Sequence, residues 1–288
     1  LAGLSFSKDG SLVAYQISEG GSDWRKVIVL NTADKSIVGE TLIDVKFSGL
    51  AWRGNEGFYY SSYDKPKEGS ALSAMTDQHK VYFHKLNTPQ SSDKLVFGGA
   101  IMPRRYVGAS LTNDERFLII SAANTTSRNE LWVKDLSDPN AKFVAVVDNF
   151  NKNHSIIDND GSKLIIYTEL DAPNGRIVTT DFETPTSKDW KTLIAETDQV
   201  LSPSTGGDKI FANYLKDATS QVKQYDKSGK LEREVELPGV GTIAGFGAKS
   251  DEKDLYYTFT SYINPGTIYK YDIASGTSEL YKQPNVQF

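Results

Sequence analysis

The stretch Leu4-Ser-Phe-Ser-Lys-Asp-Gly-Ser-Leu-Val-Ala-Tyr-Gln-Ile17 joins a short apolar segment, a polar turn and a longer apolar run. Its turn, residues 7–10, consists of residue types that favour tight turns, and the run at 12–17 has the length of a β-strand. This order of segments occurs six times along the chain, and successive long runs start roughly 45 to 60 residues apart. The period predicts an array of small β-sheets, each of which buries its faces by stacking against its neighbours.

Each repeat divides into four predicted strands. First strands are expected at 4–6, 50–52, 109–111, 155–157 and 244–246, and second strands at 12–17, 58–60, 117–120, 164–167, 210–214 and 255–259. The turns between them are expected at 7–10, 53–57, 112–115, 158–161, 204–208 and 249–253. Third strands follow at 27–30, 81–86, 131–136, 176–182, 221–226 and 268–272, and weaker fourth strands at 142–147, 191–194, 232–237 and 278–281. We therefore predict an all-β fold, a β-propeller of four-stranded antiparallel blades whose first strands line the axis.

The pattern continues from end to end without a break in composition, which predicts one domain. Its blades are expected at approximately 1–48, 49–103, 104–151, 152–197, 198–240 and 241–288. The longest insertions, 63–79 and 123–129, both fall between second and third strands and so on one face of the array, where partners usually dock. Leu1 is not a natural first residue, so we expect that a segment upstream has been removed.

Composition narrows the functional classes. The net charge is −5 and the basic residues are scattered, which argues against nucleic acid as a partner. The chain has no cysteine, which excludes disulfides and a cysteine nucleophile and fits either a reducing cytosol or a periplasm. No apolar run reaches the roughly 18 residues needed to span a bilayer, so we expect a soluble chain with no membrane contact.

The candidate catalytic groups are few. The sequence contains no Gly-x-Ser-x-Gly motif and only three histidines: His84 is expected to be a packed strand residue, and His79 and His154 to be solvated in polar loops. No spacing indicates a zinc or calcium site, so no metal is expected. Propeller glycosidases need facing carboxylates, whereas the first strands carry residues such as Ser5 and Ala51; Asp44 or Asp148 on the connections would have to supply them.

Several segments, in order, carry a resemblance to one family. They are Leu4-Ser-Phe-Ser-Lys-Asp-Gly10, Glu19-Gly-Gly-Ser-Asp-Trp24, Lys46-Phe-Ser-Gly-Leu-Ala-Trp52, Lys80-Val-Tyr-Phe-His-Lys-Leu86 and Tyr257-Thr-Phe-Thr-Ser261. Together they resemble the N-terminal β-propeller domain of the prolyl oligopeptidase family, and the resemblance covers essentially the whole chain. Asn87 stands where a glycine is usual in that family, which affects only local geometry.

The resemblance implies a seven-bladed propeller that caps an α/β-hydrolase domain with a Ser-Asp-His triad. Six of the seven blades lie in this chain, and the first blade and the hydrolase domain lie outside it. No catalytic residue is therefore expected in this chain, and no cofactor.

Five positions acquire roles from the resemblance. Asp23 is similar to a carboxylate that pairs with a substrate-handling arginine of the hydrolase domain, with a turn residue as the alternative. Phe47 is similar to an aromatic residue of the outer substrate pocket, with core packing as the alternative. Val107 resembles an apolar pocket wall, and either Thr125 or Thr126 takes the place where some relatives carry a cysteine.

The expected function is that of a gating and substrate-selecting domain of a serine peptidase that cleaves short peptides after proline. Its partners would be such peptides and the hydrolase domain of the same protein. The alternative is a free-standing propeller that binds protein or peptide ligands through its loop face.

Overall fold

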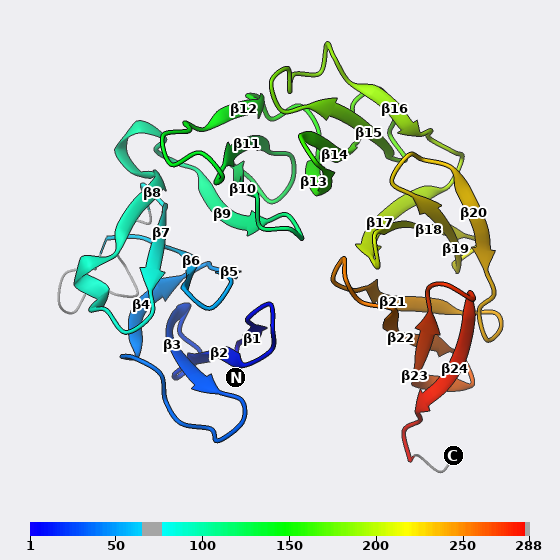
Figure 1. Cartoon of the computed structure of the whole chain (residues 1–288), viewed down its shortest axis with the longest axis horizontal. Helices are drawn as coiled ribbons and strands as arrows, with labels where there is room; N and C mark the ends of the chain where they lie inside the picture. The colour runs from blue at the N-terminus through cyan, green and yellow to red at the C-terminus, as the bar shows by residue number, and fades with distance from the viewer. Residues whose placement is uncertain (65–76, 286–288) are drawn as a thin grey trace. The chain divides into compact units, whose positions relative to one another are not determined.

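The computed structural model describes residues 1–64 and 77–285, and it divides the chain into two compact units, Leu1–Asn151 and Lys152–Phe288. Within the described residues, six four-stranded antiparallel sheets account for all named strands (Figure 1). The predicted fold class, a β-propeller type array of four-stranded antiparallel blades, is thereby confirmed. No helix in this described part is long and apolar enough to cross a membrane.

The first unit contains three sheets. The first is built from β1 (Gly3–Phe6), β2 (Leu12–Ser18), β3 (Trp24–Asn31) and β4 (Leu42–Lys46), and the second from β5 (Leu50–Arg53), β6 (Gly57–Ser62), β7 (Lys80–Lys85) and β8 (Lys94–Gly98). The third is built from β9 (Tyr106–Leu111), β10 (Phe117–Ala123), β11 (Glu130–Asp135) and β12 (Val144–Val147). In each of them the strands lie in the order in which they occur in the chain, as in a meander.

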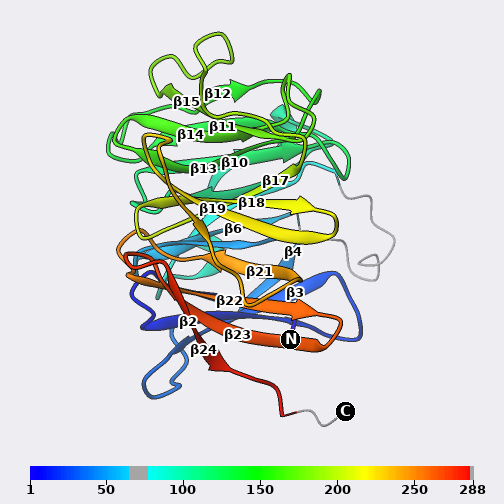
Figure 2. The ribbon, with the colours of Figure 1, turned by 90° about the vertical axis from the view of Figure 1, so that its right-hand side faces the viewer.

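The second unit repeats this order. Its sheets are β13 (His154–Asp160), β14 (Lys163–Thr168), β15 (Arg176–Asp181) and β16 (Lys191–Ile194); β17 (Val200–Gly206), β18 (Lys209–Lys216), β19 (Thr219–Asp226) and β20 (Leu231–Val235); and β21 (Thr242–Gly247), β22 (Asp254–Ser261), β23 (Asn264–Asp272) and β24 (Thr277–Lys282). Figure 2 shows the strands of these sheets edge-on. One hydrophobic core of this unit joins Phe211 of β18 to Phe246 of β21 and Tyr271 of β23, and the Tyr271 hydroxyl donates to Gln224 Oε1 at 2.7 Å.

Two predicted turns are wrong in detail. Asp158 and Asn159 lie inside β13, and Ser204 and Thr205 lie inside β17, so that both turns are shorter and start later than expected. The polar residues are tolerated in these strands because they have partners: the Lys227 ammonium lies 3.1 Å from an Asp158 carboxylate oxygen. The fourth strands β4 and β8 have no counterpart among the predicted strands, although both carry charged residues, Asp44 and Lys46 in β4 and Lys94 in β8.

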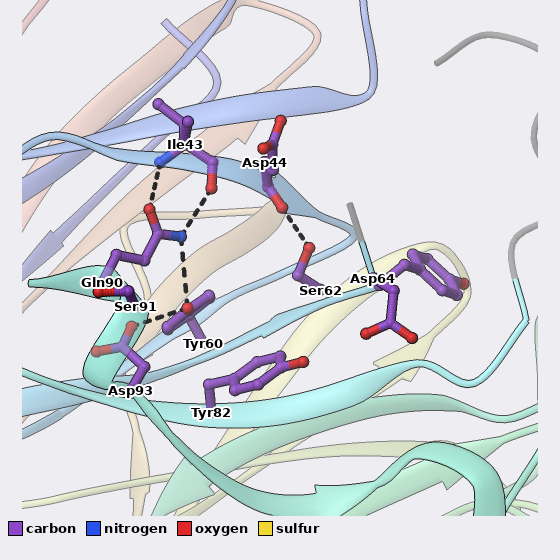
Figure 3. Close-up of a pocket in the computed structure, with 10 residues that line it drawn as sticks. Ile43, Asp44, Tyr60, Ser62, Asp64, Tyr82, Gln90, Ser91 and Asp93 are labelled. Atoms are coloured by element: carbon purple, nitrogen blue, oxygen red, sulfur yellow. Dashed lines mark hydrogen bonds between the residues drawn. The ribbon is translucent and has the colours of Figure 1, made fainter. Parts of the chain in front are cut away.

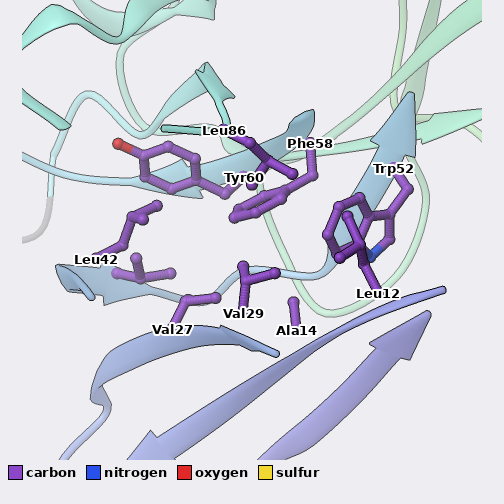
Figure 4. Packing of buried hydrophobic residues seen from close by; sticks show 10 residues of the cluster. Leu12, Ala14, Val27, Val29, Leu42, Trp52, Phe58, Tyr60 and Leu86 are labelled. Carbon is purple, nitrogen blue, oxygen red and sulfur yellow. The ribbon is translucent and has the colours of Figure 1, made fainter. Parts of the chain in front are cut away.

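Burial on both faces explains the uninterrupted apolar runs in two of the second strands. Every residue of β6 is buried, as are the first four of β10, whereas β2 alternates between buried and partly exposed positions. A strand covered on both faces by neighbouring sheets has no solvent side, so alternation disappears. Figure 4 shows this packing, where Val27 and Val29 of the first sheet lie against Phe58 and Tyr60 of the second. Each such buried side chain contributes about 2 kcal/mol.

Candidate functional site

All five predicted site residues belong to the first unit and lie at one end of its sheets. Because neighbouring strands are antiparallel, the loop between the second and third strands and the segment that follows the fourth strand share one end of each sheet. Asp23 lies between β2 and β3, Phe47 directly follows β4, and Thr125 and Thr126 lie between β10 and β11. Val107 is the second residue of β9, which begins at the same end. We call this the loop end.

An aromatic cluster occupies the loop end of the first unit. The ring of Phe47 makes edge contacts with Tyr63, at a centroid distance of 6.3 Å, and with Tyr106, at 6.0 Å. Phe47 is 43% exposed and Tyr106 47%, whereas Tyr63 is buried. Phe47 is therefore not packed in the core, which was the alternative reading of this residue. Its ring meets that of Tyr106 at the surface, and the ring of Tyr63 lies buried beside them. Such a surface suits apolar side chains of a ligand.

A buried lysine lies beside this cluster. Lys46 is only 8% exposed, and its ammonium lies 4.9 Å from the ring centroid of Trp24 and 5.1 Å from that of Phe47. Cation–π contacts of this kind are worth about 1 to 2 kcal/mol when desolvated. Lys46 thus connects Trp24, next to Asp23 in the chain, with the exposed ring of Phe47.

His79 lies beneath the cluster, contrary to the prediction that it is solvated. It is 1% exposed, its Nε2 donates to the carbonyl oxygen of Lys46 at 3.0 Å, and its Nδ1 accepts from the N–H of Val107 at 3.0 Å. Burial lowers the pKa of His79, which favours the neutral imidazole that this pair of bonds requires. The prediction was wrong because His79 bonds the backbone of Lys46 at the end of the first sheet and of Val107 in the third sheet, which buries its ring between them.

The remaining predicted residues differ in their surroundings. Asp23 is exposed at the end of a turn in which the Ser18 hydroxyl donates to the Ser22 carbonyl at 2.6 Å. Val107 is 1% exposed and belongs to a core cluster, so any wall that it forms lies behind the side chains of the loop end. Thr125 and Thr126 are both exposed, and the Thr125 hydroxyl donates to the Ser127 carbonyl at 2.7 Å.

Sequence reasoning missed Lys46, Tyr63, His79 and Tyr106 as members of this site. Tyr106 directly precedes Val107, and Lys46 directly precedes Phe47, so proximity in the chain was the available signal. Tyr63 and His79 are the two ends of the insertion 63–79, which was expected on the docking face and whose residues 65–76 lie outside the described part, but only the stacking of the sheets shows that these ends meet Phe47 and Tyr106.

A separate pocket of about 380 Å³ lies between β4 and the second sheet (Figure 3). The Gln90 side chain bonds both backbone groups of Ile43, at 3.0 and 2.8 Å, and the Tyr60 hydroxyl donates to Asp93 at 2.9 Å. Asp93 also contacts His84 Nδ1 at 2.9 Å, which confirms the packed strand histidine predicted there. Burial raises the pKa of Tyr60. The polar side chains of this pocket bond one another or the backbone of β4. The hydrogen bonds between Gln90 and Ile43 therefore stabilise the contact between the first and second sheets.

Metal-binding geometry is not found in the described part of the chain, where no group of three His, Asp or Glu side chains converges.

The stacked four-stranded antiparallel sheets, with an exposed aromatic surface at their loop end, define the chain as a domain of the β-propeller class. The family model for the prolyl oligopeptidase N-terminal β-propeller domain matches residues 1–284, so the chain belongs to this family.

Known relatives agree with this assignment. The chain is 56% identical to the prolyl endopeptidase of Elizabethkingia meningoseptica and 54% identical to that of Elizabethkingia miricola, in each case over all of this chain and 41% of the relative. A solved chain from a study of two prolyl endopeptidases superimposes with a TM-score of 0.88 at 31% identity, covering 97% of this chain and 40% of that one. Prolyl oligopeptidase B from Galerina marginata, bound to a 35mer substrate, has a TM-score of 0.85 at 23% identity over 98% of this chain and 42% of its own, which shows the shared fold alone. The chain thus spans about two fifths of the length of these relatives.

Proposed function

We propose that this chain is the substrate-selecting propeller domain of a serine peptidase that cleaves short peptides on the carboxyl side of proline. The observation that carries the proposal is the family match over residues 1–284, together with relatives named prolyl endopeptidases at more than half identity. The catalytic triad would lie in an α/β-hydrolase domain of the same protein. The propeller would restrict access to that triad, so that short, unstructured peptides reach it and folded proteins do not.

The loop end of the first unit supports a role in contacting peptides. Phe47 and Tyr106 offer two partly exposed rings, and Thr125 and Thr126 are exposed on a neighbouring loop at the same end. Asp23 would pair with an arginine of the hydrolase domain, and its exposure fits a contact with another domain. We place the protein in the periplasm or the cytosol.

The test compares the complete gene product with the isolated chain on a Gly-Pro reporter substrate. We expect the gene product to release the reporter and the isolated chain to show no turnover. The control is the gene product with its serine nucleophile replaced by alanine, which should be inactive at the same protein concentration. Turnover by the isolated chain, or a complete gene product without a hydrolase domain, would contradict the proposal.

A second candidate function is that of a free-standing binding module. It is favoured by an exposed apolar group at the loop end of the second unit, where Val240 is 82% exposed, Ile263 is 92% exposed and Tyr262 is fully exposed. Exposed apolar patches often mark docking surfaces. A gene product that ends with this chain and binds a peptide or protein through these residues would support this alternative.

A further inference from the structure

The backbone at Phe47 is in an unusual conformation. Its φ angle is +51°, in the left-handed region that a bulky side chain rarely adopts. Strain of this kind persists only where the surrounding structure holds it, and it is concentrated at functional positions. Phe47 also carries a ring that is 43% exposed, so this strained conformation does not bury the side chain. The conformation instead directs the ring towards Tyr106 at the surface.

Phe47 is held through both of its neighbours in the chain. On the preceding side, His79 Nε2 donates to the carbonyl oxygen of Lys46 at 3.0 Å. On the following side, the N–H of Ser61 donates to the hydroxyl oxygen of Ser48 at 2.7 Å. The two anchors come from the second sheet, whereas Lys46 ends the first sheet, so the conformation of Phe47 depends on contact between two sheets.

The same histidine also holds the second exposed ring. The N–H of Val107, the residue after Tyr106, donates to His79 Nδ1 at 3.0 Å, and the Ser61 hydroxyl donates to the Val107 carbonyl at 2.8 Å. The imidazole stacks on Tyr63 at 4.5 Å between ring centroids and lies 6.3 Å from the ring of Tyr106. His79 therefore connects β4, the start of β7 and β9, one strand from each of the three sheets of this unit.

We propose that His79 is a positioning residue that holds Phe47 and Tyr106 as a pair for binding the peptide substrate. The inference rests on the function proposed above. A neutral imidazole with its proton on Nε2 donates one bond and accepts the other, and no apolar residue of the same size does both. Position 79 therefore requires a side chain that donates a hydrogen bond to Lys46 and accepts one from Val107. The packing of a buried aromatic ring alone does not meet this requirement.

The test uses the complete gene product carrying His79→Phe, His79→Gln or no change. His79→Phe keeps a ring against Tyr63 but removes both hydrogen bonds, whereas His79→Gln retains a donor and an acceptor. The matched control is His154→Phe, which removes a buried histidine from the second unit. For a short proline-containing peptide we expect His79→Phe to raise KM about tenfold or more, with kcat within about twofold. His79→Gln should restore KM to near the wild-type value, and His154→Phe should leave it unchanged.

A second readout does not depend on catalysis. Ring resonances of Phe47 and Tyr106 in the isolated chain, recorded by NMR with labelled aromatic residues, should shift in His79→Phe and return towards wild type in His79→Gln. An active enzyme whose KM is the same in His79→Phe would overturn the inference. If the unmodified gene product cleaves no proline peptide, the proposed function fails, and unmoved ring resonances in His79→Phe would then separately reject the role of His79.

Discussion

At the scale of single residues, the three histidines show how far burial departs from what a local sequence suggests. All three are buried, and each has a defined partner: His79 bonds two backbone groups, His84 bonds Asp93, and His154 Nδ1 lies 2.8 Å from the Thr168 hydroxyl. His154 is also in edge contact with Trp190 at 5.9 Å. The packed position of His84 was predicted from the sequence, whereas the polar residues around His79 and His154 gave no indication of their burial.

The burial of His154 predicts a pH dependence of stability. Desolvation lowers the pKa of His154 from 6.5 to about 4, although the charge of Glu169 opposes the shift. Between these values the unfolded chain binds a proton at His154 that the folded chain does not, so the contribution of His154 to the free energy of unfolding falls as the pH drops from 6.5 to 4 and is level outside this window. The contribution of His154 to this loss is at most about 3 kcal/mol.

Urea unfolding of wild type and His154→Gln at pH 7 and pH 4.5 measures this contribution. We expect the wild type to lose more stability on acidification than the variant, with the remaining loss in the variant including that of His79, whose pKa is also lowered by burial. Equal losses in the two proteins would show that His154 is protonated without cost in the folded state.

Replacing Asp23 by asparagine removes its charge and changes the size of the side chain little. Because Asp23 is exposed, Asp23→Asn should change the free energy of unfolding of the chain by no more than about 0.5 kcal/mol. In the complete gene product, Asp23→Asn would leave an arginine of the hydrolase domain unpaired. The value of kcat/KM should then fall by a factor that corresponds to a loss of about 2 kcal/mol or more of transition-state stabilisation. Asp251→Asn, at an exposed turn between β21 and β22, is the control and should leave kcat/KM unchanged. If the kcat/KM of Asp23→Asn equalled that of the wild type, the alternative role of Asp23 as a turn residue would be favoured.

At the scale of elements, close approach of backbones decides which residues a strand accepts. Gly57 begins β6, where a Cβ atom would lie 2.0 Å from the carbonyl oxygen of His84 on β7. Gly108 lies in β9, where a Cβ atom would have nothing within 4 Å. The two glycines look alike in the sequence, and the difference comes from the pairing of the strands.

We therefore expect Gly57→Ala to destabilise the chain by at least about 2 kcal/mol, since the obstructing atom belongs to a paired strand and cannot rotate away. Gly108→Ala, as the matched control, should stay within about 0.5 kcal/mol of wild type. Thermal and urea unfolding of both variants provide the measurement. If Gly57→Ala were as stable as Gly108→Ala, β6 and β7 would have to be further apart than described.

At the scale of the whole molecule, selection by size is the property that the proposed function requires of this domain. In the complete gene product, we expect a short proline-containing peptide to be cleaved, while the same sequence displayed on a loop of a stably folded protein stays intact. The control is the carrier protein after denaturation and digestion into fragments, whose proline sites should become cleavable. Comparable cleavage of the folded carrier would show that the propeller does not restrict access.

The sequence by itself determined the repeat, the all-β class and most of the strands. Runs such as 117–120 and 164–167 are strongly apolar, so the strands are local and readable, although the turn residues before 164–167 did not mark the end of the preceding strand. The resemblance directed attention to Phe47 and Asp23, both of which lie at the loop end.

Only the tertiary structure decided which side chains complete the site. Tyr63, His79 and Tyr106 come from separate segments, and the left-handed backbone of Phe47 is held by partners from another sheet. Hydrogen bonds and ring contacts between sheets depend on how the sheets stack, and no short stretch of sequence records that stacking. The repeat therefore follows from local periodicity, whereas the arrangement of the loop end follows from packing between residues distant in the chain.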